Sequence, residues 1–281
     1  MIHTTLAELA DRFDVFLVDQ FGVLLDGRSA YPGAARALSE LAGCGKRVAV
    51  LSNSGKRAAP NVDRLIRMGF AQEDFETVFS SGEAAHRVLA RRIGRDLPAG
   101  ANVLVLSRDG DLSGIDDLDL TFSDDPTRAD LVLIAGSRGE DVPLDFYREL
   151  LADPANRRVP ALCTNPDRTM LTECGLVYGA GQIADLYREL GGPVDEIGKP
   201  YPLIYRMAAQ GLGSPAPSTV LCIGDSPAHD IRGAHAAGFA AALVRTGIHA
   251  DTPLEDLLED APPNDRPNYV IPAFLWAAPS L

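Results

Sequence analysis

Short apolar runs alternate with stretches of helix-like apolar spacing along the whole chain. Runs rich in β-branched and other apolar residues predict strands at 15–21, 47–52, 76–80, 103–106, 131–135, 160–163, 219–223, 240–244 and 269–271. Helical spacing of apolar residues predicts helices at 32–41, 60–68, 83–92, 143–151, 182–190 and 201–210. This alternation is typical of βαβ units, so we expect an α/β fold with a mostly parallel sheet.

The composition indicates a globular protein with an acidic surface. With 281 residues, 46% of them hydrophobic, the chain is long enough for two domains with separate cores. A formal net charge of −13 argues against nucleic acid and anionic membranes as partners, because both are negatively charged. No apolar stretch reaches the roughly 18 residues of a membrane span. The N-terminal residues lack a secretory signal pattern and the four cysteines are scattered, so we expect a cytoplasmic protein with reduced thiols.

Acidic and hydroxyl side chains follow several of the predicted strands. Asp19 lies near the end of the first apolar run, Ser52 ends the second, and Asp225 and Asp230 follow the run at 219–223. In an open α/β sheet, ligands gather at the carboxyl edge of the strands. Carboxylates that converge there repel one another unless a cation offsets them, and Mg²⁺ prefers such an all-oxygen site. These residues, with Lys199 between them in the sequence, predict an Mg²⁺ site for phosphoryl chemistry.

The order and local context of these segments resemble the haloacid dehalogenase-like hydrolase superfamily, most closely its class IIA. The resemblance is carried by Asp19-Gln20-Phe21-Gly22, Leu51-Ser52-Asn53-Ser54, Cys163-Thr164-Asn165-Pro166-Asp167, Tyr178-Gly179-Ala180-Gly181, Gly198-Lys199-Pro200 and the stretch from Gly224-Asp225-Ser226 to Asp230. It implies a Rossmann-like core of residues 1–81 and 192–281, with an inserted α/β cap of the C2 type at 82–191. Cap-mediated dimerisation is common in this superfamily, which leaves a homodimer as a possible assembly.

The resemblance also implies a role for each matching residue. Asp19 would be the nucleophile that accepts the phosphoryl group as an aspartyl-phosphate, and it would also bind Mg²⁺. Asp225, Asp230 and the backbone oxygen of Phe21 would complete the coordination of the metal ion. Lys199 would neutralise charge between the nucleophile and the phosphate.

A second group of residues is expected to hold the substrate. Ser52 and the neighbouring amides of Asn53 and Ser54 would bind the phosphate oxygens, as the resemblance implies. Arg57 is a candidate for an anion contact from the rim, and Asn165 is a further candidate for phosphate or substrate binding. The implied substrate is a small phosphorylated metabolite, and a sugar phosphate is one candidate.

Phe21 departs from the family pattern, which usually has a second Asp at this position. In family phosphatases that Asp protonates the leaving oxygen and then activates water, and loss of such a group costs roughly 10²–10⁴ in rate. The first interpretation is a phosphatase that keeps its turnover because its leaving group is good, or because another group or a metal-bound water substitutes for the missing Asp. The second is a metal- or ligand-binding protein without turnover. The third is a dehalogenase-like C–X hydrolase, which has an aromatic residue here but needs neither Mg²⁺ nor the pair Asp225 and Asp230. We expect the phosphatase, because the nucleophile, the lysine and both metal carboxylates are present.

Overall fold

The computed structural model describes residues 2–172 and 175–276. By the contacts among its residues, the chain divides into two compact units. The core unit comprises 1–52, 59–79 and 199–281, and the cap unit comprises 53–58 and 80–198. The domain boundaries expected from the sequence lie at 81/82 and 191/192, and no pattern in the sequence indicates that the short segment 53–58 belongs to the cap unit.

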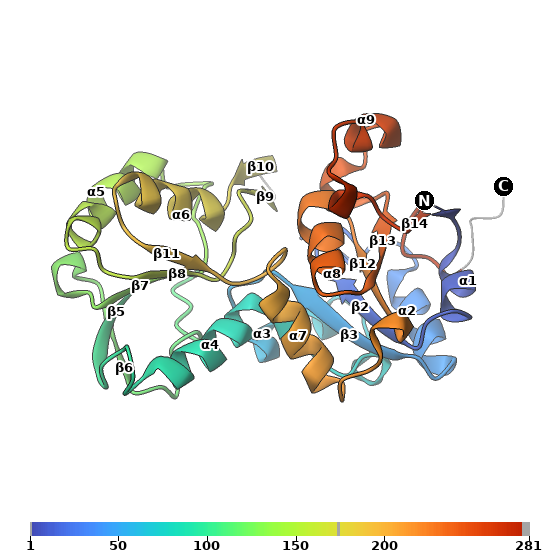
Figure 1. Cartoon of the computed structure of the whole chain (residues 1–281), viewed down its shortest axis with the longest axis horizontal. Helices are drawn as coiled ribbons and strands as arrows, with labels where there is room; N and C mark the ends of the chain where they lie inside the picture. Colours follow the sequence, from blue (N-terminus) through green and yellow to red (C-terminus); the bar gives the residue numbers. More distant parts are fainter. Residues whose placement is uncertain (1, 173–174, 277–281) are drawn as a thin grey trace. The chain divides into compact units, whose positions relative to one another are not determined.

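The core unit contains a seven-stranded sheet in the order β1-β14-β13-β12-β2-β3-β4 (Figure 1). The strands are β1 (Ile2–His3), β2 (Val15–Asp19), β3 (Arg47–Ser52), β4 (Val78–Ser80), β12 (Val220–Gly224), β13 (Ala240–Val244) and β14 (Tyr269–Ile271). β2 pairs in parallel with β12 on one side and β3 on the other. All five residues of β2 are buried, as expected for a strand at the centre of a parallel sheet.

The register of these central strands determines where the polar side chains lie. Asp19 lies opposite Leu51, one residue before the end of β3, and Val18 lies opposite Ile223 in β12. The carboxyl ends of three neighbouring strands therefore meet at one edge of the sheet. That edge carries the polar residues predicted from the sequence.

Helices cover both faces of the core sheet because the side chains of each strand alternate between the faces. Phe16 and Val18 of β2 pack in the hydrophobic cluster that includes α1 and α2. Val15 and Leu17 pack in a second cluster, which includes α7 and α8. The helices of this part of the chain are α1 (Leu6–Ala10), α2 (Ala34–Gly43), α3 (Ala58–Arg67), α7 (Pro202–Gly211), α8 (Arg232–Ala236) and α9 (Leu254–Leu258).

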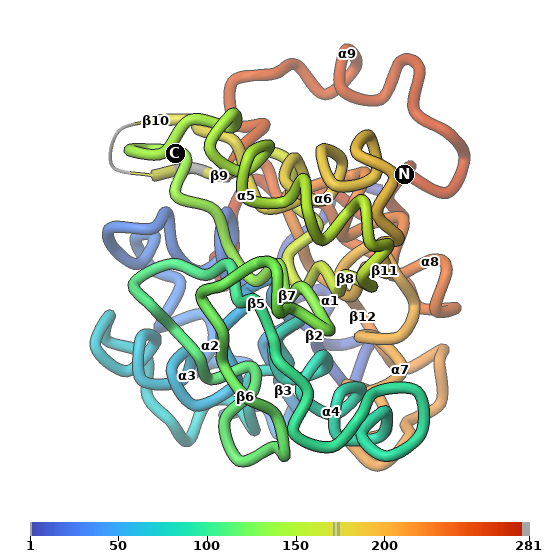
Figure 2. The backbone as a smooth tube through the Cα atoms, turned by 90° about the vertical axis from the view of Figure 1, so that its left-hand side faces the viewer, coloured from blue at the N-terminus to red at the C-terminus, as the bar shows by residue number. Residues whose placement is uncertain are grey.

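The cap unit contains its own five-stranded parallel sheet in the order β11-β8-β7-β5-β6 (Figure 2). Its strands are β5 (Ala101–Leu106), β6 (Leu120–Ser123), β7 (Leu131–Ile134), β8 (Ala161–Cys163) and β11 (Val194–Glu196), and its helices are α4 (Ser81–Arg92), α5 (Leu144–Asn156) and α6 (Ala180–Glu189). Side chains of β5, β7 and β8 pack against α5 and α6 in a separate hydrophobic cluster. An antiparallel hairpin of β9 (Thr169–Thr172) and β10 (Gly175–Tyr178) completes the unit. The cap is therefore an α/β domain with a core of its own.

Candidate functional site

Asp19 ends the central strand of the core sheet, and the backbone turns sharply after it. The amide of Gln20 donates to Asp19 Oδ1 at 2.7 Å. Gly22 follows with a φ of 85°, which glycine adopts without strain. A Cβ atom at Gly22 would lie 2.2 Å from Asp225 Oδ2, so the backbone here passes directly beside that carboxylate. The turn therefore requires glycine for two reasons, its conformation and its contact with Asp225.

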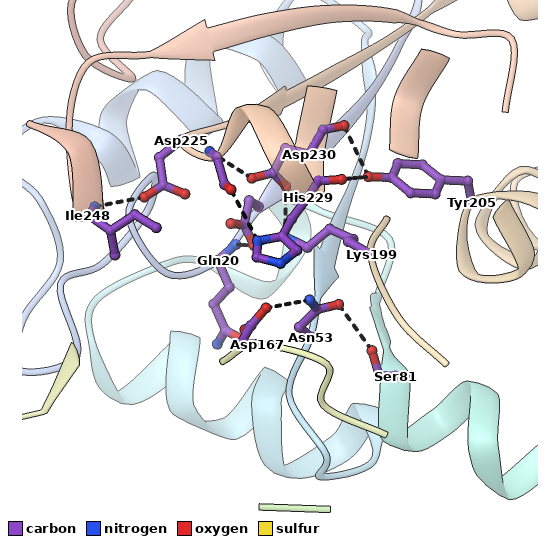
Figure 3. Close-up of polar contacts among 12 residues, drawn as sticks. Gln20, Asn53, Ser81, Asp167, Lys199, Tyr205, Asp225, His229, Asp230 and Ile248 are labelled. Atoms are coloured by element: carbon purple, nitrogen blue, oxygen red, sulfur yellow. Dashed lines mark hydrogen bonds and ion pairs between the residues drawn. The ribbon is translucent and has the colours of Figure 1, made fainter. Parts of the chain in front are cut away.

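Asp225 and Asp230 come from the end of β12 and the helical turn that follows it. This turn, Pro227–Ile231, is π-helical, a geometry that is often found at functional sites. Asp225 Oδ2 accepts from the amide of Ile248 at 2.9 Å, and Asp230 Oδ2 accepts from the amide of Ser226 at 3.1 Å (Figure 3). Backbone amides thus hold both carboxylates in position.

Lys199 connects the nucleophile candidate with this turn. Its Nζ lies 2.6 Å from Asp19 Oδ1 and 2.7 Å from Asp230 Oδ1. The lysine is 3% exposed, and Lys is almost never fully buried without partners. The two ion pairs join residues that are 180 and 31 positions apart in the chain (199 − 19 and 230 − 199).

Burial and mutual repulsion shift the pKa values of this cluster. Burial raises the pKa of Asp19 well above its usual value; Lys199 opposes the rise, while Asp230 and Asp225 add to it. Burial and the charge of Asp230 raise the pKa of Asp225 to about 7. Burial alone would lower the pKa of Lys199, but the carboxylates of Asp19 and Asp230 raise it overall. One ammonium group is therefore too little positive charge for three buried carboxylates.

The donor set fits a divalent metal ion. One carboxylate oxygen from each of Asp19, Asp225 and Asp230 lies within 4.8 Å of the other two, and all three residues are buried. Three ionised carboxylates and one lysine leave a net charge of −2 (−3 + 1), which a divalent cation would offset. Oxygen-only donors suit a hard cation such as Mg²⁺ or Ca²⁺.

Phe21 stands at the edge of the cluster with 36% of its surface exposed. The guanidinium carbon of Arg64, on α3, lies 5.4 Å from the centroid of its ring, which is the geometry of a cation–π contact. Arg64 was not among the residues singled out from the sequence, because nothing in the spacing of α3 connects it with position 21. The metal contact expected for the backbone oxygen of Phe21 stays a prediction.

The substrate-binding candidates divide between the two units. Ser52 is buried at the end of β3 in the core unit, whereas Asn53, Ser54, Arg57 and Asn165 belong to the cap unit. The structure brings Ser52 to the same sheet edge as Asp19. The four cap residues have contacts of their own within the cap.

Those contacts engage the side chains of three of the predicted substrate-binding residues. Asn53 Nδ2 donates to Asp167 Oδ1 at 2.7 Å, and Ser81 Oγ donates to Asn53 Oδ1 at 3.3 Å (Figure 3). Arg57 Nε lies 3.0 Å from Glu83 Oε2. Asn165 Oδ1 accepts from the backbone amide of Asp167 at 3.1 Å.

Tyr205, on α7, is a site residue that sequence reasoning did not identify. Its buried hydroxyl donates to the backbone oxygens of Asp230 at 3.1 Å and His229 at 3.3 Å (Figure 3). It therefore holds the π-helical turn that carries Asp230. In the sequence Tyr205 looks like any apolar position of an amphipathic helix, so no local signal reveals this contact.

A bilayer-spanning helix is not found among the described residues.

Comparison with known proteins places the chain in a family. Residues 16–121 match the family model of haloacid dehalogenase-like hydrolases, and residues 196–277 match a second model of the same kind, described as HAD-hydrolase-like. Mouse chronophin is 30% identical over 240 residues, which cover 83% of this chain and 80% of the relative.

Solved structures share the fold over nearly the whole chain. A haloacid dehalogenase-like hydrolase from Brucella suis has a TM-score of 0.83 at 26% identity, covering 97% of this chain and 99% of that one. A glycerol phosphate phosphatase from Mycobacterium tuberculosis, solved in complex with magnesium, has a TM-score of 0.75 at 26% identity, covering 95% and 77%. The chain belongs to the haloacid dehalogenase-like hydrolase family, in its class IIA branch of phosphoric monoester hydrolases.

Proposed function

We propose that this protein is an Mg²⁺-dependent phosphatase of small phosphorylated metabolites, with Asp19 as the nucleophile. The observation that carries the proposal is the buried bridge of Lys199 between Asp19 and Asp230, within a cluster of three carboxylates. Burial of a lysine and three converging carboxylates lowers the stability of the folded protein. Such a cluster is therefore expected where it binds a cation and an anionic substrate.

In the proposed reaction, a carboxylate oxygen of Asp19 attacks phosphorus and the bond from phosphorus to the leaving oxygen breaks. The phosphoryl group is then carried as an aspartyl-phosphate, which water hydrolyses to release phosphate and restore Asp19. Lys199 lies within ion-pair distance of Asp19 and would neutralise negative charge as the phosphoryl group transfers.

Asp19, Asp225 and Asp230 would hold the metal ion. When bound, it supplies positive charge that offsets the carboxylates and stabilises the transferring phosphoryl group. The magnesium complex of the related glycerol phosphate phosphatase supports the choice of metal. The glycerol phosphate in that relative's name also supports a small phosphorylated substrate, and a sugar phosphate is one candidate. The phosphate contacts expected of Ser52, Asn53, Ser54, Arg57 and Asn165 stay predictions.

Phe21 favours a second candidate, a protein that binds metal and phosphate without turnover. The ring cannot transfer a proton, and general acid/base catalysis contributes roughly 10²–10⁴ in rate. The intact Lys199 bridge favours the phosphatase over this alternative.

The test is the hydrolysis of p-nitrophenyl phosphate and a panel of phosphorylated metabolites, with Mg²⁺ and with EDTA. Turnover is expected with Mg²⁺ only, and Asp19→Asn is expected to lower it by more than about 10³-fold. Asp14→Asn is the matched control, because it makes the same change just before the other end of β2, where Asp14 pairs with Lys46 at the surface.

Equal activity in EDTA, or activity that survives Asp19→Asn, would contradict the proposal. Binding of Mg²⁺ without turnover of any compound in the panel would support the binding protein instead.

A further inference from the structure

We propose that the turn 246–248 makes the metal site select Mg²⁺ over Ca²⁺, because it leaves Asp225 a single oxygen with which to bind a cation. This inference rests on the metal site of the proposed function and deepens it by naming what decides between the two ions. It is carried by the Ile248 amide on Asp225 Oδ2 and by the two glycine backbones beside this carboxylate.

One oxygen of Asp225 is already engaged by the protein. The backbone amide of Ile248 donates to Asp225 Oδ2 at 2.9 Å, and Asp225 is 5% exposed (Figure 3). A Cβ atom at Gly247 would lie 1.9 Å from the same oxygen, and one at Gly22 would lie 2.2 Å from it. Two backbones therefore pass close beside Oδ2 and leave a cation little room there. Oδ1 is the oxygen with which Asp225 can bind a metal ion.

A second contact holds the turn 246–248 in this position. The hydroxyl of Thr246 donates to the backbone oxygen of Gly22, which attaches the turn to the loop that follows Asp19. Asp225 is therefore enclosed between two segments that are bonded to each other. It cannot readily rotate to offer both of its oxygens to one ion.

The other two carboxylates of the cluster also bind donors of the protein. Lys199 Nζ lies 2.6 Å from Asp19 Oδ1 and 2.7 Å from Asp230 Oδ1, so a cation at either oxygen would lie close to the ammonium charge and be repelled. Asp230 Oδ2 accepts from the amide of Ser226 at 3.1 Å. Each carboxylate thus has at least one oxygen occupied, which favours metal contacts through single oxygens.

Mg²⁺ and Ca²⁺ differ in the number of oxygens that they require from a protein. Mg²⁺ needs a near-ideal octahedral arrangement, keeps several waters and uses only one or two carboxylates. Ca²⁺ takes about 6–8 oxygens at longer distances and often binds both oxygens of one carboxylate. A rigid site that offers single carboxylate oxygens therefore suits Mg²⁺, whereas Ca²⁺ lacks the additional protein ligands that would favour it.

The test is isothermal titration calorimetry of the full chain, freed of metal, with MgCl₂ and separately with CaCl₂ at pH 8. For wild type, we expect the Kd for Ca²⁺ to be no lower than the Kd for Mg²⁺. Ile248→Pro removes the amide hydrogen in the first turn of a 3-10 helix, Gly247–His249, where proline is tolerated. The ratio of the Kd for Ca²⁺ to the Kd for Mg²⁺ should then fall about tenfold, because Oδ2 loses a charged hydrogen bond and becomes available as a ligand.

Ile248→Ala is the matched control. It shortens the same side chain, which is 45% exposed, and keeps the backbone amide, so the ratio of the two Kd values should stay that of wild type.

Infrared difference spectroscopy gives a second readout. The antisymmetric and symmetric carboxylate stretches lie further apart when one oxygen binds an ion than when both oxygens bind it. Wild type with Mg²⁺ should show the single-oxygen pattern. Ile248→Pro with Ca²⁺ should gain the two-oxygen pattern, and Ile248→Ala with Ca²⁺ should not.

The outcomes separate this inference from the proposed function. Tighter binding of Ca²⁺ than of Mg²⁺ by wild type overturns the inference, as does an unchanged ratio in Ile248→Pro. Neither result affects the phosphatase, whose test is turnover with Mg²⁺. If neither ion binds, the metal part of the proposed function is overturned, and the inference with it. If Ile248→Pro does not fold, the wild-type titrations and spectra still test the inference.

Discussion

Lys199 is the residue on which the buried cluster most depends. It pairs with two carboxylates inside the protein, and removing one partner of a buried ion pair costs about 3–5 kcal/mol because the remaining charge is left uncompensated. We expect Lys199→Met to lower the free energy of unfolding by about this amount in EDTA, measured by urea denaturation. Mg²⁺ should restore part of the loss.

The control for this prediction is Lys46→Met. Lys46 pairs with Asp14 at 3.2 Å, and the Asp14 side chain is 70% exposed. Surface ion pairs contribute at most about 1 kcal/mol, so this variant should stay close to wild type. Equal losses in the two variants would contradict a special role of the buried lysine.

Asp225 makes the stability of the metal-free protein depend on pH. Its pKa is about 7 in the folded protein, against 3.8 as the ordinary value, because burial and Asp230 disfavour the charged form. The folded state therefore binds more protons than the unfolded state between these values, and stability falls as pH rises through this range. We expect the free energy of unfolding in EDTA to fall from pH 5 to pH 8 by on the order of a few kcal/mol more in wild type than in Asp225→Asn. Parallel pH profiles for the two proteins would contradict this account.

The charged residues of the cluster could be predicted from the sequence, whereas their supports could not. Asp19 and Asp225 follow apolar runs, and strand ends of a parallel sheet share an edge, so their meeting follows from the fold. Arg64 and Tyr205 act through contacts between elements far apart in the chain. Their partners, a ring and two backbone oxygens, leave no trace in the local sequence.

At the scale of elements, α7 supports the π-helical turn through Tyr205. Removing the hydroxyl in Tyr205→Phe frees the backbone oxygens of His229 and Asp230 and loosens the turn that presents Asp230. We expect the dissociation constant for Mg²⁺, measured by calorimetry, to rise about tenfold. One hydrogen bond is worth roughly 0.5–1.5 kcal/mol, so the loss of overall stability should be modest.

Tyr187→Phe is the matched control for this prediction. Tyr187 is also fully buried, and its hydroxyl donates to the backbone oxygen of Val159 at 2.8 Å within the cap unit. It should lose similar stability without any change in Mg²⁺ affinity. If both variants bind Mg²⁺ like wild type, the turn does not need Tyr205 for its position.

The predicted elements that proved right are those with a strong apolar pattern. The strands predicted at 47–52, 240–244 and 269–271 match β3, β13 and β14 residue for residue. β6 was missed because it lies in an Asp-rich stretch at the edge of the cap sheet, where Thr121 and Phe122 face solvent and no apolar run forms. The helix predicted at 143–151 continues to Asn156, because Leu151 and Ala155 bury one face beyond the predicted end. These differences between predicted and observed elements arise from edge position and packing, which depend on the assembled fold.

At the scale of the whole molecule, the metal candidates belong to the core unit alone, and each unit has its own sheet and hydrophobic cluster. A ligand at a free concentration about one hundred times its dissociation constant stabilises the folded protein by about 2.7 kcal/mol. We therefore expect Mg²⁺ to slow hydrogen exchange in β2 and β12 by up to about 100-fold, and to change β5 and β7 far less, as measured by mass spectrometry.

Asp225→Asn serves as the control, since it should abolish the protection of β2 and β12 at the same Mg²⁺ concentration. Protection spread evenly over the core and cap strands would show that the two units unfold as one.

The strand order of the core sheet has a consequence for the growing polypeptide. By the time a ribosome has passed Gly198, it has made every strand of the cap sheet, yet β12, β13 and β14 are still to come. β2, which carries Asp19, will then have β3 on one flank and an open hydrogen-bonding edge on the other. An open, apolar edge of this kind invites aggregation. During synthesis, β2 therefore stays unpaired on one side until β12 has been made. Asp19, the first catalytic candidate to be synthesised, lies on this strand.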